Sequence, residues 1–421
     1  MTKYRLVSIT FKLSESGHFM KNFRSKRLAP IKESAIRRII DLAAKRKDVI
    51  HLEQGEPSFS TPGHITEAAI SAMRDGFTHY GPTKGIPELR EAVARKLTNE
   101  NKLPVDGPED VLVVSGTQEA MFLAALTFLD RGDEALVFEP FYPAYPEETL
   151  IAGAKPVIVP LSVEDNYQIK IDQLQKHVTS MTKMIWLNSP ANPTGHVFSE
   201  RDLKAVARVA LENDLIVFAD EIYEKLVYDK TEHVSIGSLP GMRDKVITVN
   251  GFSKSYAMAG WRVGYVSAQR ELLDQMNKLH YYAVLCPSSV AQKAALAALN
   301  GPQNCVDEMV REYDQRRRVI MDGLKRIGLP YLVPKGAFYI FPDVTKFGND
   351  DEAIAEVLLK EHGVAVVPGS GFGETCRGHL RMSFSTPVEE LQEGIRRLQD
   401  GFENLASKKE TSSRTGEKTR S

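Results

Sequence analysis

Lys254 and Arg262 are the residues of this sequence whose types and spacing point most directly to chemistry. A lysine amine adds to a carbonyl only when neutral, and a partly desolvated position after the apolar run 246–249 favours that form. We therefore interpret Lys254 as a Schiff-base lysine. The Arg262 guanidinium can hold two phosphate oxygens at once, so the pair suits a phosphorylated aldehyde. Taken alone, a solvated lysine and a surface salt bridge would be the default interpretation.

Polar residues also follow other apolar runs. Asn192 lies in Asn-Ser-Pro-Ala-Asn-Pro-Thr-Gly at 188–195, where prolines and glycine prevent further strand pairing. Asp220 directly follows the run 215–219, and Tyr223 comes three residues later. A buried aspartate needs a cationic partner to stay ionised, and a protonated ring nitrogen would be one. A turn asparagine and a helix N-cap aspartate are the structural alternatives.

Ser115, Gly116 and Thr117 lead from the apolar pair 113–114 into a helical pattern. Free backbone N–H groups and the helix dipole would face a ligand at that turn, and a phosphate fits such a place. Ser253 could add one more hydroxyl. A helix cap without any ligand is the alternative.

The elements that must position these groups alternate between apolar runs and amphipathic helical patterns. Buried strands are expected at 135–138, 184–187, 215–219 and 246–249. This alternation predicts an α/β fold with a doubly wound, mostly parallel sheet. Ligands of such sheets gather beyond the carboxyl ends of the strands, where the polar residues fall.

Together these residues resemble the fold-type I pyridoxal-phosphate aminotransferases, in their class I branch. The resemblance rests on Ser-Lys-x-x-x-Met-x-Gly-Trp-Arg at 253–262 and on Asn-Pro-Thr-Gly at 192–195. It extends from about Pro30 to about Leu405 and is greatest for the aspartate-aminotransferase-like subgroup. It implies a pyridoxal 5′-phosphate cofactor, a large doubly wound domain, a small α/β domain and a homodimer.

The resemblance also implies a role for each residue. Lys254 would form an aldimine with the cofactor and act as the catalytic base, while Asp220 would face the pyridine nitrogen. Arg381, Asn192 and Gly55 would bind the substrate. Asn192 and Tyr223 would also bind the ring oxygen of the cofactor, and Tyr142 would lie on the ring face. The phosphate would be bound by Ser115, Gly116, Thr117, Ser253 and Arg262. Tyr80 would reach the phosphate of the neighbouring subunit. Tyr80 and Tyr142 could instead be core aromatics.

The implied reaction moves the amino group of an L-amino acid to a 2-oxo acid. The subgroup favours aspartate and 2-oxoglutarate, but alanine, aromatic, methionine and kynurenine-like donors stay open, since no second arginine lies in a motif for a distal carboxylate. A fold-type I lyase, such as a C–S lyase or an aminocyclopropane-carboxylate-synthase-like enzyme, would use the same cofactor residues. A transcription regulator would need a helix-turn-helix module, for which the N-terminal extension is too short.

The expected domains are an N-terminal extension at 1–28, a small-domain segment at 29–60, a large cofactor-binding domain at 61–305, a small C-terminal domain at 306–405 and a disordered tail at 406–421. The basic extension could be an organelle presequence, an upstream mis-start before Met20, or a structured arm. The tail has almost no apolar residues to pack.

Composition narrows the possible partners. The 421 residues carry 54 basic and 55 acidic side chains, a balance that favours neither nucleic acid nor an anionic membrane as partner. The three cysteines, at wide spacing, fit reduced thiols in a cytoplasmic enzyme better than a disulfide framework or a metal site. We expect Arg316, Arg317 and Arg318 to form a solvated helix face, and 368–373 to be a flexible loop.

Overall fold

The structure is a computed structural model that describes residues 25–31 and 35–418. Its centre is a seven-stranded sheet in the order β2-β8-β7-β6-β5-β3-β4. Only β8 runs opposite to the rest of this sheet, pairing antiparallel with both β2 and β7. The strands are β2 (Val111–Val114), β3 (Glu134–Glu139), β4 (Lys155–Pro160), β5 (Thr182–Asn188), β6 (Ile216–Asp220), β7 (Val246–Gly251) and β8 (Gly264–Ser267). The four strands expected from apolar runs are confirmed.

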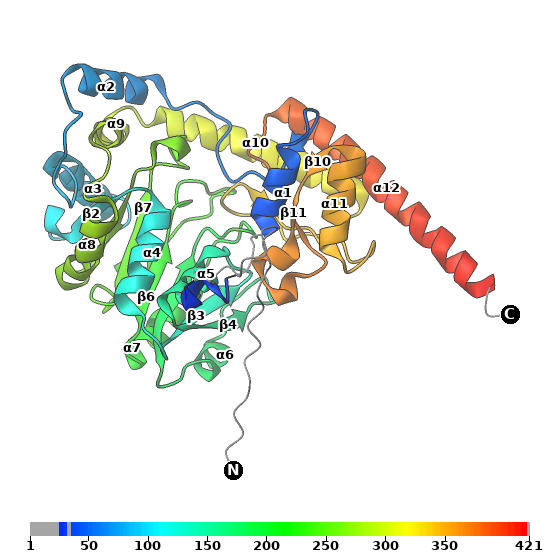
Figure 1. Cartoon of the computed structure of the whole chain (residues 1–421), viewed down its shortest axis with the longest axis horizontal. Coiled ribbons are helices and arrows are strands. Elements are labelled where there is room, and N and C mark those ends of the chain that lie inside the picture. Colours follow the sequence, from blue (N-terminus) through cyan, green and yellow to red (C-terminus); the bar gives the residue numbers. More distant parts are fainter. Residues whose placement is uncertain (1–24, 32–34, 419–421) are drawn as a thin grey trace, which may run out of the picture.

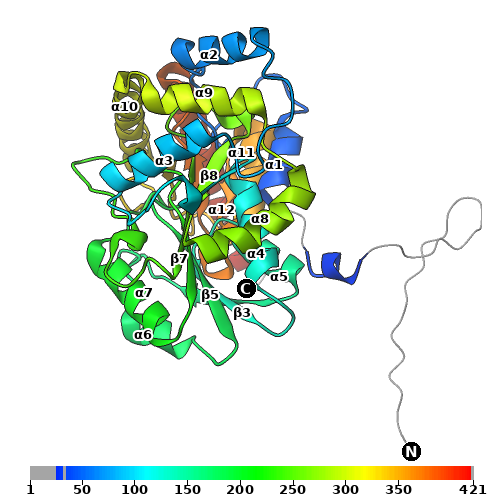
Figure 2. The ribbon, with the colours of Figure 1, turned by 90° about the vertical axis from the view of Figure 1, so that its left-hand side faces the viewer.

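Alternate side chains of these strands enter two separate cores. Leu136, Ile185 and Val217 face one core, whereas Val137 and Phe218 face the other. Helices α6 (Ile171–Lys176) and α7 (Glu200–Glu212) cover the first face, and α4 (Thr117–Phe128), α5 (Ala144–Ala152) and α8 (Arg270–Val284) cover the second. Figure 2 shows the sheet between these two helical layers. The predicted doubly wound α/β fold is confirmed.

A further core lies beside the large sheet and is built mainly from the C-terminal part of the chain (Figure 1). Strands β11 (Val367–Pro368), β12 (Leu380–Ser383) and β9 (Tyr339–Ile340) form one small sheet. β1 (Ile50–His51) pairs in parallel with β10 (Val364–Ala365), which joins an early segment to this part. The helices here are α1 (Ala35–Ala43), α10 (Asn304–Ile327), α11 (Asp351–His362) and α12 (Val388–Lys418). The domain boundaries given above stay a prediction.

The remaining α-helices are α2 (Gly63–Arg74), α3 (Pro87–Asn99) and α9 (Ser289–Asn300). Helix α9 packs on both α2 and α3 at the far side of the large sheet. Among the described helices, none combines the length and the apolar composition that a membrane crossing requires.

The termini differ from expectation at one end. Helix α12 continues through 406–418, where the sequence predicted a disordered tail, so that prediction is wrong for these residues. The segment contains no proline and continues a helix whose earlier residues Leu398 and Phe402 are buried, so no new helix has to begin there, and Lys408 pairs with Glu361 at 3.0 Å. Residues 419–421 lie outside the described residues. Of the extension at 1–28, only 25–28 are described, with a short 3-10 helix, η1 (Lys26–Leu28).

Two smaller predictions are also wrong. Arg316 and Arg317 are buried, at 4% and 1% exposed, rather than lying on a solvated helix face. Arg317 donates to both carboxylate oxygens of Asp229 at 2.8 and 3.0 Å and to the Pro334 carbonyl at 2.8 Å. Residues 369–372 form a short 3-10 helix with Phe372 buried, not a flexible loop. Arg317 also pairs with Asp314 of its own helix, but Asp229 and Pro334 come from distant segments, as does Phe141, whose amide donates to the Phe372 carbonyl; local composition cannot reveal such partners.

Replacing Arg317 by alanine is expected to lower the free energy of unfolding by about 3 kcal/mol, because it removes a buried two-oxygen ion pair. Arg318→Ala is the matched control: its side chain is 65% exposed. The control should change stability by less than about 0.5 kcal/mol. Chemical denaturation followed by circular dichroism measures both values, and equal losses in the two variants would contradict this account.

Candidate functional site

A cavity of about 590 Å³ opens beyond the carboxyl ends of β5, β6 and β7, and residues of the C-terminal part, Tyr339 and Arg381, also line it. Its walls come from segments that are far apart in the sequence. Of the predicted site residues, those that line it are Gly55, Thr117, Tyr142, Asn192, Asp220, Tyr223, Ser253, Lys254, Arg262 and Arg381. Ser115 and Gly116, which directly precede Thr117 in the sequence, and Tyr80 are not among the lining residues.

Lys254 lies shortly after β7, and its amine donates a hydrogen bond to the Gly55 carbonyl. Burial lowers the pKa of Lys254 to about 8, against the opposing effect of the negative charges of Glu56 and Asp220. The amine is 5.7 Å from the ring centroids of both Tyr223 and Phe338. A substantial fraction of this amine is therefore neutral near physiological pH and available to a carbonyl.

Asp220 ends β6 with its carboxyl group buried, at 4% exposed. Burial raises the pKa of Asp220 to about 6, although hydrogen bonds from Tyr145 and from the Ile222 amide oppose the rise. The Tyr145 hydroxyl donates to one oxygen at 2.8 Å, and the Ile222 N–H donates to the other at 3.1 Å. Both bonds favour the ionised carboxylate, and a cationic ligand at the cavity would favour it further.

Tyr145 was not singled out by the sequence. It belongs to α5, and its ring stacks on Trp186 of β5 with centroids 5.3 Å apart. That stack directs the hydroxyl to Asp220. The sequence offered one signal, the position of Tyr145 one helical turn after Tyr142 and just after a strand, but it did not show that Asp220 lies opposite.

Arg262 lies against the start of α4. A Cβ built on Gly116, which has φ +84°, would come within 2.4 Å of Nη2 of Arg262, so only glycine leaves room there. The first amides of α4 have no intrahelical acceptor, and the guanidinium adds a full positive charge beside them. The Ser115 amide is different, because it donates to the Glu119 carboxylate at 2.5 Å. Positive charge and free helix amides at this corner could hold an anion, whereas the Ser115 amide is already engaged by Glu119.

Arg381 of β12 is 2% exposed and has no carboxylate partner among the described residues. It donates to the Asn192 side-chain oxygen at 3.3 Å and to the Glu53 carbonyl, while its buried Nε has no partner. Its guanidinium lies 4.6 Å from the Tyr339 ring centroid. A buried guanidinium without an anion is costly, so this position calls for an anionic ligand such as a carboxylate.

Asn188, which the sequence analysis did not assign to the site, fastens the loop that carries Asn192. Its side chain accepts from the Asn192 amide at 2.8 Å and donates to the Asp220 carbonyl at 3.0 Å. Tyr223 shares a hydrogen bond of 2.9 Å with Tyr339, a residue that the sequence did not assign to the site. These contacts hold the polar groups of β5, β6 and β9 around one space.

The two predicted aromatics have different positions. Tyr142 is half-buried at the cavity wall, where its hydroxyl donates to Gln118 at 3.2 Å. Tyr80 is 85% exposed and makes no part of the cavity of its own chain. Tyr80 is therefore not a core residue.

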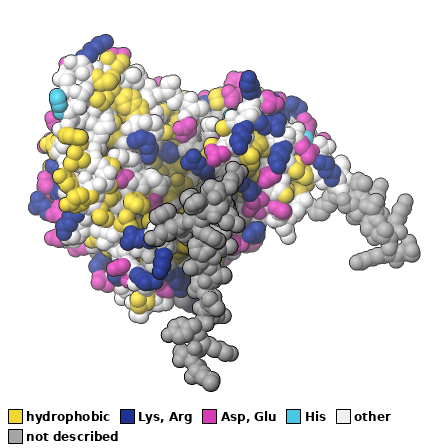
Figure 3. All heavy atoms as spheres, viewed as in Figure 1, with side chains coloured by type: hydrophobic (Ala, Val, Ile, Leu, Met, Phe, Trp, Pro, Cys, Tyr) yellow, Lys and Arg dark blue, Asp and Glu magenta, His cyan; other side chains and the backbone are white. Residues whose placement is uncertain are grey.

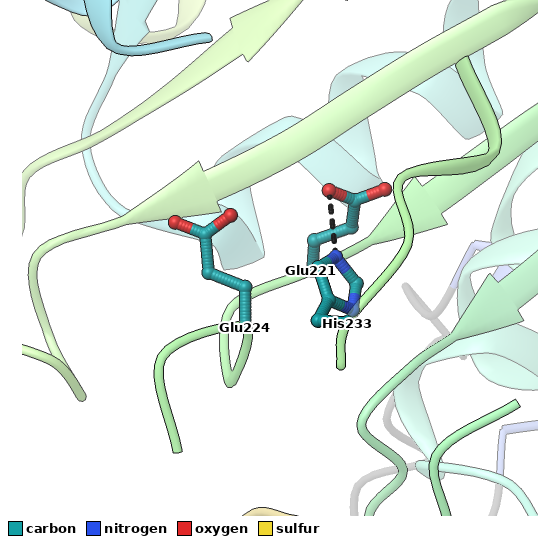
Figure 4. Close-up of side chains that lie close together, drawn as sticks. All are labelled: Glu221, Glu224 and His233. Atoms are coloured by element: carbon teal, nitrogen blue, oxygen red, sulfur yellow. Dashed lines mark ion pairs between the residues drawn. The ribbon is translucent and has the colours of Figure 1, made fainter. Parts of the chain in front are cut away.

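A buried ion cluster lies beside the turn that follows Asp220. The side chains of Glu221, Glu224 and His233 lie close together, as Figure 4 shows, and His233 pairs with Glu221 at 3.1 Å. Burial favours neutral Glu224, but the charges of Lys96 and His233 outweigh it and lower its pKa to about 2. Lys96 of α3 binds Glu224 directly, so a metal ion here would have to compete with an ammonium group. The cluster ties the turn that carries Tyr223 to α3.

A family model described as aminotransferase class I and II matches residues 47–398. The chain belongs to this family. It is 44% identical over 377 residues to an aspartate aminotransferase of Pyrococcus abyssi, covering 89% of this chain and 97% of the relative. It is 41% identical over 377 residues to an aromatic-amino-acid aminotransferase of Thermococcus litoralis, with 89% and 97% covered. The aspartate aminotransferase of Thermus thermophilus, solved with maleate, superposes with a TM-score of 0.86 at 38% identity, covering 90% of this chain and 100% of that one.

Enzymes of this aminotransferase family use pyridoxal 5′-phosphate, and the cavity has the groups that this cofactor requires. A buried amine is present at Lys254, a buried carboxyl group at Asp220, and a guanidinium beside a helix start at Arg262. Because Gly116 has no side chain, the Arg262 guanidinium can lie against the start of α4, where it and the helix amides could hold a phosphate. The chain is thus a pyridoxal-phosphate-dependent aminotransferase.

Tyr145→Phe is expected to weaken the binding of pyridoxal phosphate to the cofactor-free enzyme about tenfold, because a hydrogen bond to a charged carboxylate contributes ~1.5 kcal/mol. Without it, the pKa of Asp220 rises further and less of the carboxyl group is ionised at pH 7. Equilibrium dialysis at pH 7 measures the affinity. Tyr331→Phe removes a hydrogen-bonded phenol outside the cavity and serves as the control. An unchanged affinity in Tyr145→Phe would refute the contribution of this bond.

Proposed function

We propose that this aminotransferase moves the amino group of an L-amino acid, with aspartate as a donor, to a 2-oxo acid such as 2-oxoglutarate. One observation carries the proposal: the buried amine of Lys254 shares a single cavity with the buried carboxyl group of Asp220 and the unpaired guanidinium of Arg381. The names of the relatives support it, because they include aspartate and aromatic-amino-acid aminotransferases.

Each end of the cofactor has candidate partners in the cavity. Asp220 would face the ring nitrogen, and the phosphate would lie between Arg262 and the start of α4. When bound, pyridoxal phosphate supplies an electron-accepting ring that stabilises negative charge on the substrate carbon. The remaining contacts that we propose are Asn192 and Tyr223 on the ring oxygen, Tyr142 on the ring face, and Ser115, Gly116, Thr117 and Ser253 near the phosphate.

The substrate would be oriented by its α-carboxylate. The Arg381 guanidinium can bind both carboxylate oxygens, and its present neighbours, Asn192 and the aromatic ring of Tyr339, fix its plane. Gly55 lies beside this position and has no side chain to block it; a Cβ there would come within 2.9 Å of the Tyr339 hydroxyl. This clamp would aim the α C–H bond at Lys254, whose amine is the group that accepts and returns the proton.

The cavity also offers different surfaces to a substrate side chain. Ile36, Ile40 and Met121 give it an apolar wall, and Arg37 lies on the same rim. An aromatic or aliphatic side chain would pack on the apolar wall, and a dicarboxylate would find a second cation at the rim. The maleate of the Thermus thermophilus structure is a dicarboxylate. A panel of amino donors, followed by the cofactor spectrum, ranks these classes.

We further propose that the enzyme is a cytoplasmic homodimer in which Tyr80 reaches the site of the partner subunit. Figure 3 shows apolar side chains on the side of the molecule that carries α2, α4 and α8. The exposed large apolar residues of these helices and of the segment after α2 include Met73, Phe77, Tyr80, Phe122, Tyr281 and Tyr282. Exposed apolar side chains that gather on one side of a molecule are typical of an interface. The three free cysteines agree with a reducing compartment.

Lys254→Ala is expected to abolish turnover and the visible absorbance of the bound cofactor, because no other buried amine lines the described cavity. Absorbance spectra and a coupled assay for 2-oxo acid measure both properties. Lys278→Ala, a change at a surface lysine of α8, is the control and should leave both intact. Turnover retained by Lys254→Ala would refute the assignment.

Mixing subunits tests the role of Tyr80. A hybrid of one Tyr80→Ala subunit and one Lys254→Ala subunit has one site with both residues intact, provided that Tyr80 serves its partner's site. We therefore expect the inactive Lys254→Ala enzyme and the weakened Tyr80→Ala enzyme to yield up to half of the wild-type activity per hybrid dimer when they are unfolded together and refolded. If Tyr80 instead serves its own subunit, neither site of the hybrid is complete and no activity returns.

A further inference from the structure

Glu148 is a second buried carboxyl group close to Asp220, and the reaction described above does not use it. It lies in α5, one helical turn after Tyr145, and is 5% exposed. Its Oε2 atom is buried without a hydrogen-bond partner, and no lysine, arginine or histidine pairs with it among residues 25–31 and 35–418. A carboxylate is rarely buried in this way, whereas a protonated carboxyl group carries no charge to solvate.

The other oxygen of Glu148 begins a chain of hydrogen bonds that ends at the cavity. The side-chain amide nitrogen of Gln118 donates to Oε1 of Glu148, and the amide oxygen of Gln118 accepts from the Tyr142 hydroxyl at 3.2 Å. Gln118 and Tyr142 both line the cavity. Because the two ends of one amide are engaged, Glu148 determines which way Gln118 presents its acceptor to Tyr142.

The charges around α5 favour the neutral form of Glu148. Burial raises the pKa of Glu148 to about 8; the hydrogen bond from Gln118 opposes the rise, and the negative charge of Asp220 adds to it. The charged groups of the neighbouring elements are engaged elsewhere or exposed: Glu119 of α4 with His280, Glu139 of β3 with Thr375, Lys155 of β4 with Glu134, and Lys26 and Arg27 of η1 exposed. None of the basic groups among them forms an ion pair with Glu148 that would stabilise its negative charge.

We propose that Glu148 is a positioning residue whose neutral carboxyl group, acting through Gln118, holds the Tyr142 ring against the cofactor, and that loss of its proton releases this hold. The inference rests on the proposed role of Tyr142 at the ring face. An ionised Glu148 would accept a stronger hydrogen bond from Gln118, but the cost of burying its charge is larger than that gain, so it is favoured to reach water and to move away from Asp220. That movement removes the acceptor of the Gln118 amide, so the amide loses its fixed orientation and Tyr142 loses its acceptor.

The test compares wild type, Glu148→Gln and Glu148→Ala in their affinity for pyridoxamine phosphate. This form of the cofactor makes no bond with Lys254, so the titration of that amine contributes less. Equilibrium dialysis from pH 6.5 to 9.5 gives the dissociation constant Kd. We expect the wild-type Kd to rise about tenfold across the upper part of this range relative to Glu148→Gln, which keeps a neutral side chain throughout. Glu148→Ala should bind weakly at every pH.

A second measurement needs no cofactor. The folded-state pKa of Glu148 lies above its unfolded value, so its contribution to stability is complete below the unfolded pKa and declines as pH rises toward about 8. The melting temperature of the cofactor-free wild type should therefore fall relative to that of Glu148→Gln between pH 5 and 8, and the difference should level off above that range. Infrared spectroscopy at pH 6.5 should show a protonated carboxyl band that Glu148→Gln lacks.

The outcomes separate this proposal from the proposed function. Glu148→Gln with the same alkaline loss of affinity as wild type, or Glu148→Ala with wild-type affinity, would overturn the role of Glu148. Failure of the wild type to bind pyridoxal phosphate or pyridoxamine phosphate at any pH would refute the proposed function instead. Glu200→Gln, a change at an exposed glutamate of α7, should follow the wild-type profile; a flattened profile there would show that the effect is not specific to Glu148. If Glu148→Ala does not fold, Glu148→Gln and the infrared band decide.

Discussion

A carboxylate buried at the end of a strand is the constraint around which this site is organised. Asp220 lies at 4% exposure, and no described lysine, arginine or histidine forms an ion pair with it. Two hydrogen bonds, from Tyr145 and from the Ile222 amide, support its charge, and they do not fully offset the cost of burial. The cavity therefore favours a cationic ligand at this point, and the stack of Tyr145 on Trp186 keeps the supporting hydroxyl in place.

The same cavity contains two other unbalanced charges. Arg381, from the small sheet, has no carboxylate partner among the described residues, and Arg262 lies beside the positive end of α4. An anion at each of these places and a cation at Asp220 would neutralise all three groups. A phosphorylated pyridine with an attached amino acid carries charges of these signs, which is why one cavity can serve both cofactor and substrate. The amine of Lys254 lies among these charges with a pKa lowered to about 8.

Much of the site could be predicted because its residues end apolar runs. Asp220 and Lys254 follow buried strands, and parallel strands bring their carboxyl ends to one edge of the sheet. Other features could not be predicted. The burial of Arg317 depends on its ion pair with Asp229. The Ser115 amide was expected to bind the phosphate, but it donates to the carboxylate of Glu119. The helix across 406–418 was missed because few apolar residues were taken to mean disorder, although the segment continues a helix that is already anchored by buried residues.

The sequence by itself determined the fold class, the strand runs and the family, because periodicity and the motif around Lys254 are local properties of the chain. Only the tertiary structure decided which groups meet: Arg381 with Asn192, Tyr145 with Asp220, and Glu148 with Gln118. Each of these pairs joins segments that are distant in sequence. Burial, and with it the protonation state of a carboxyl group or an amine, depends on all the atoms around it, so these properties follow from packing and not from the order of residues.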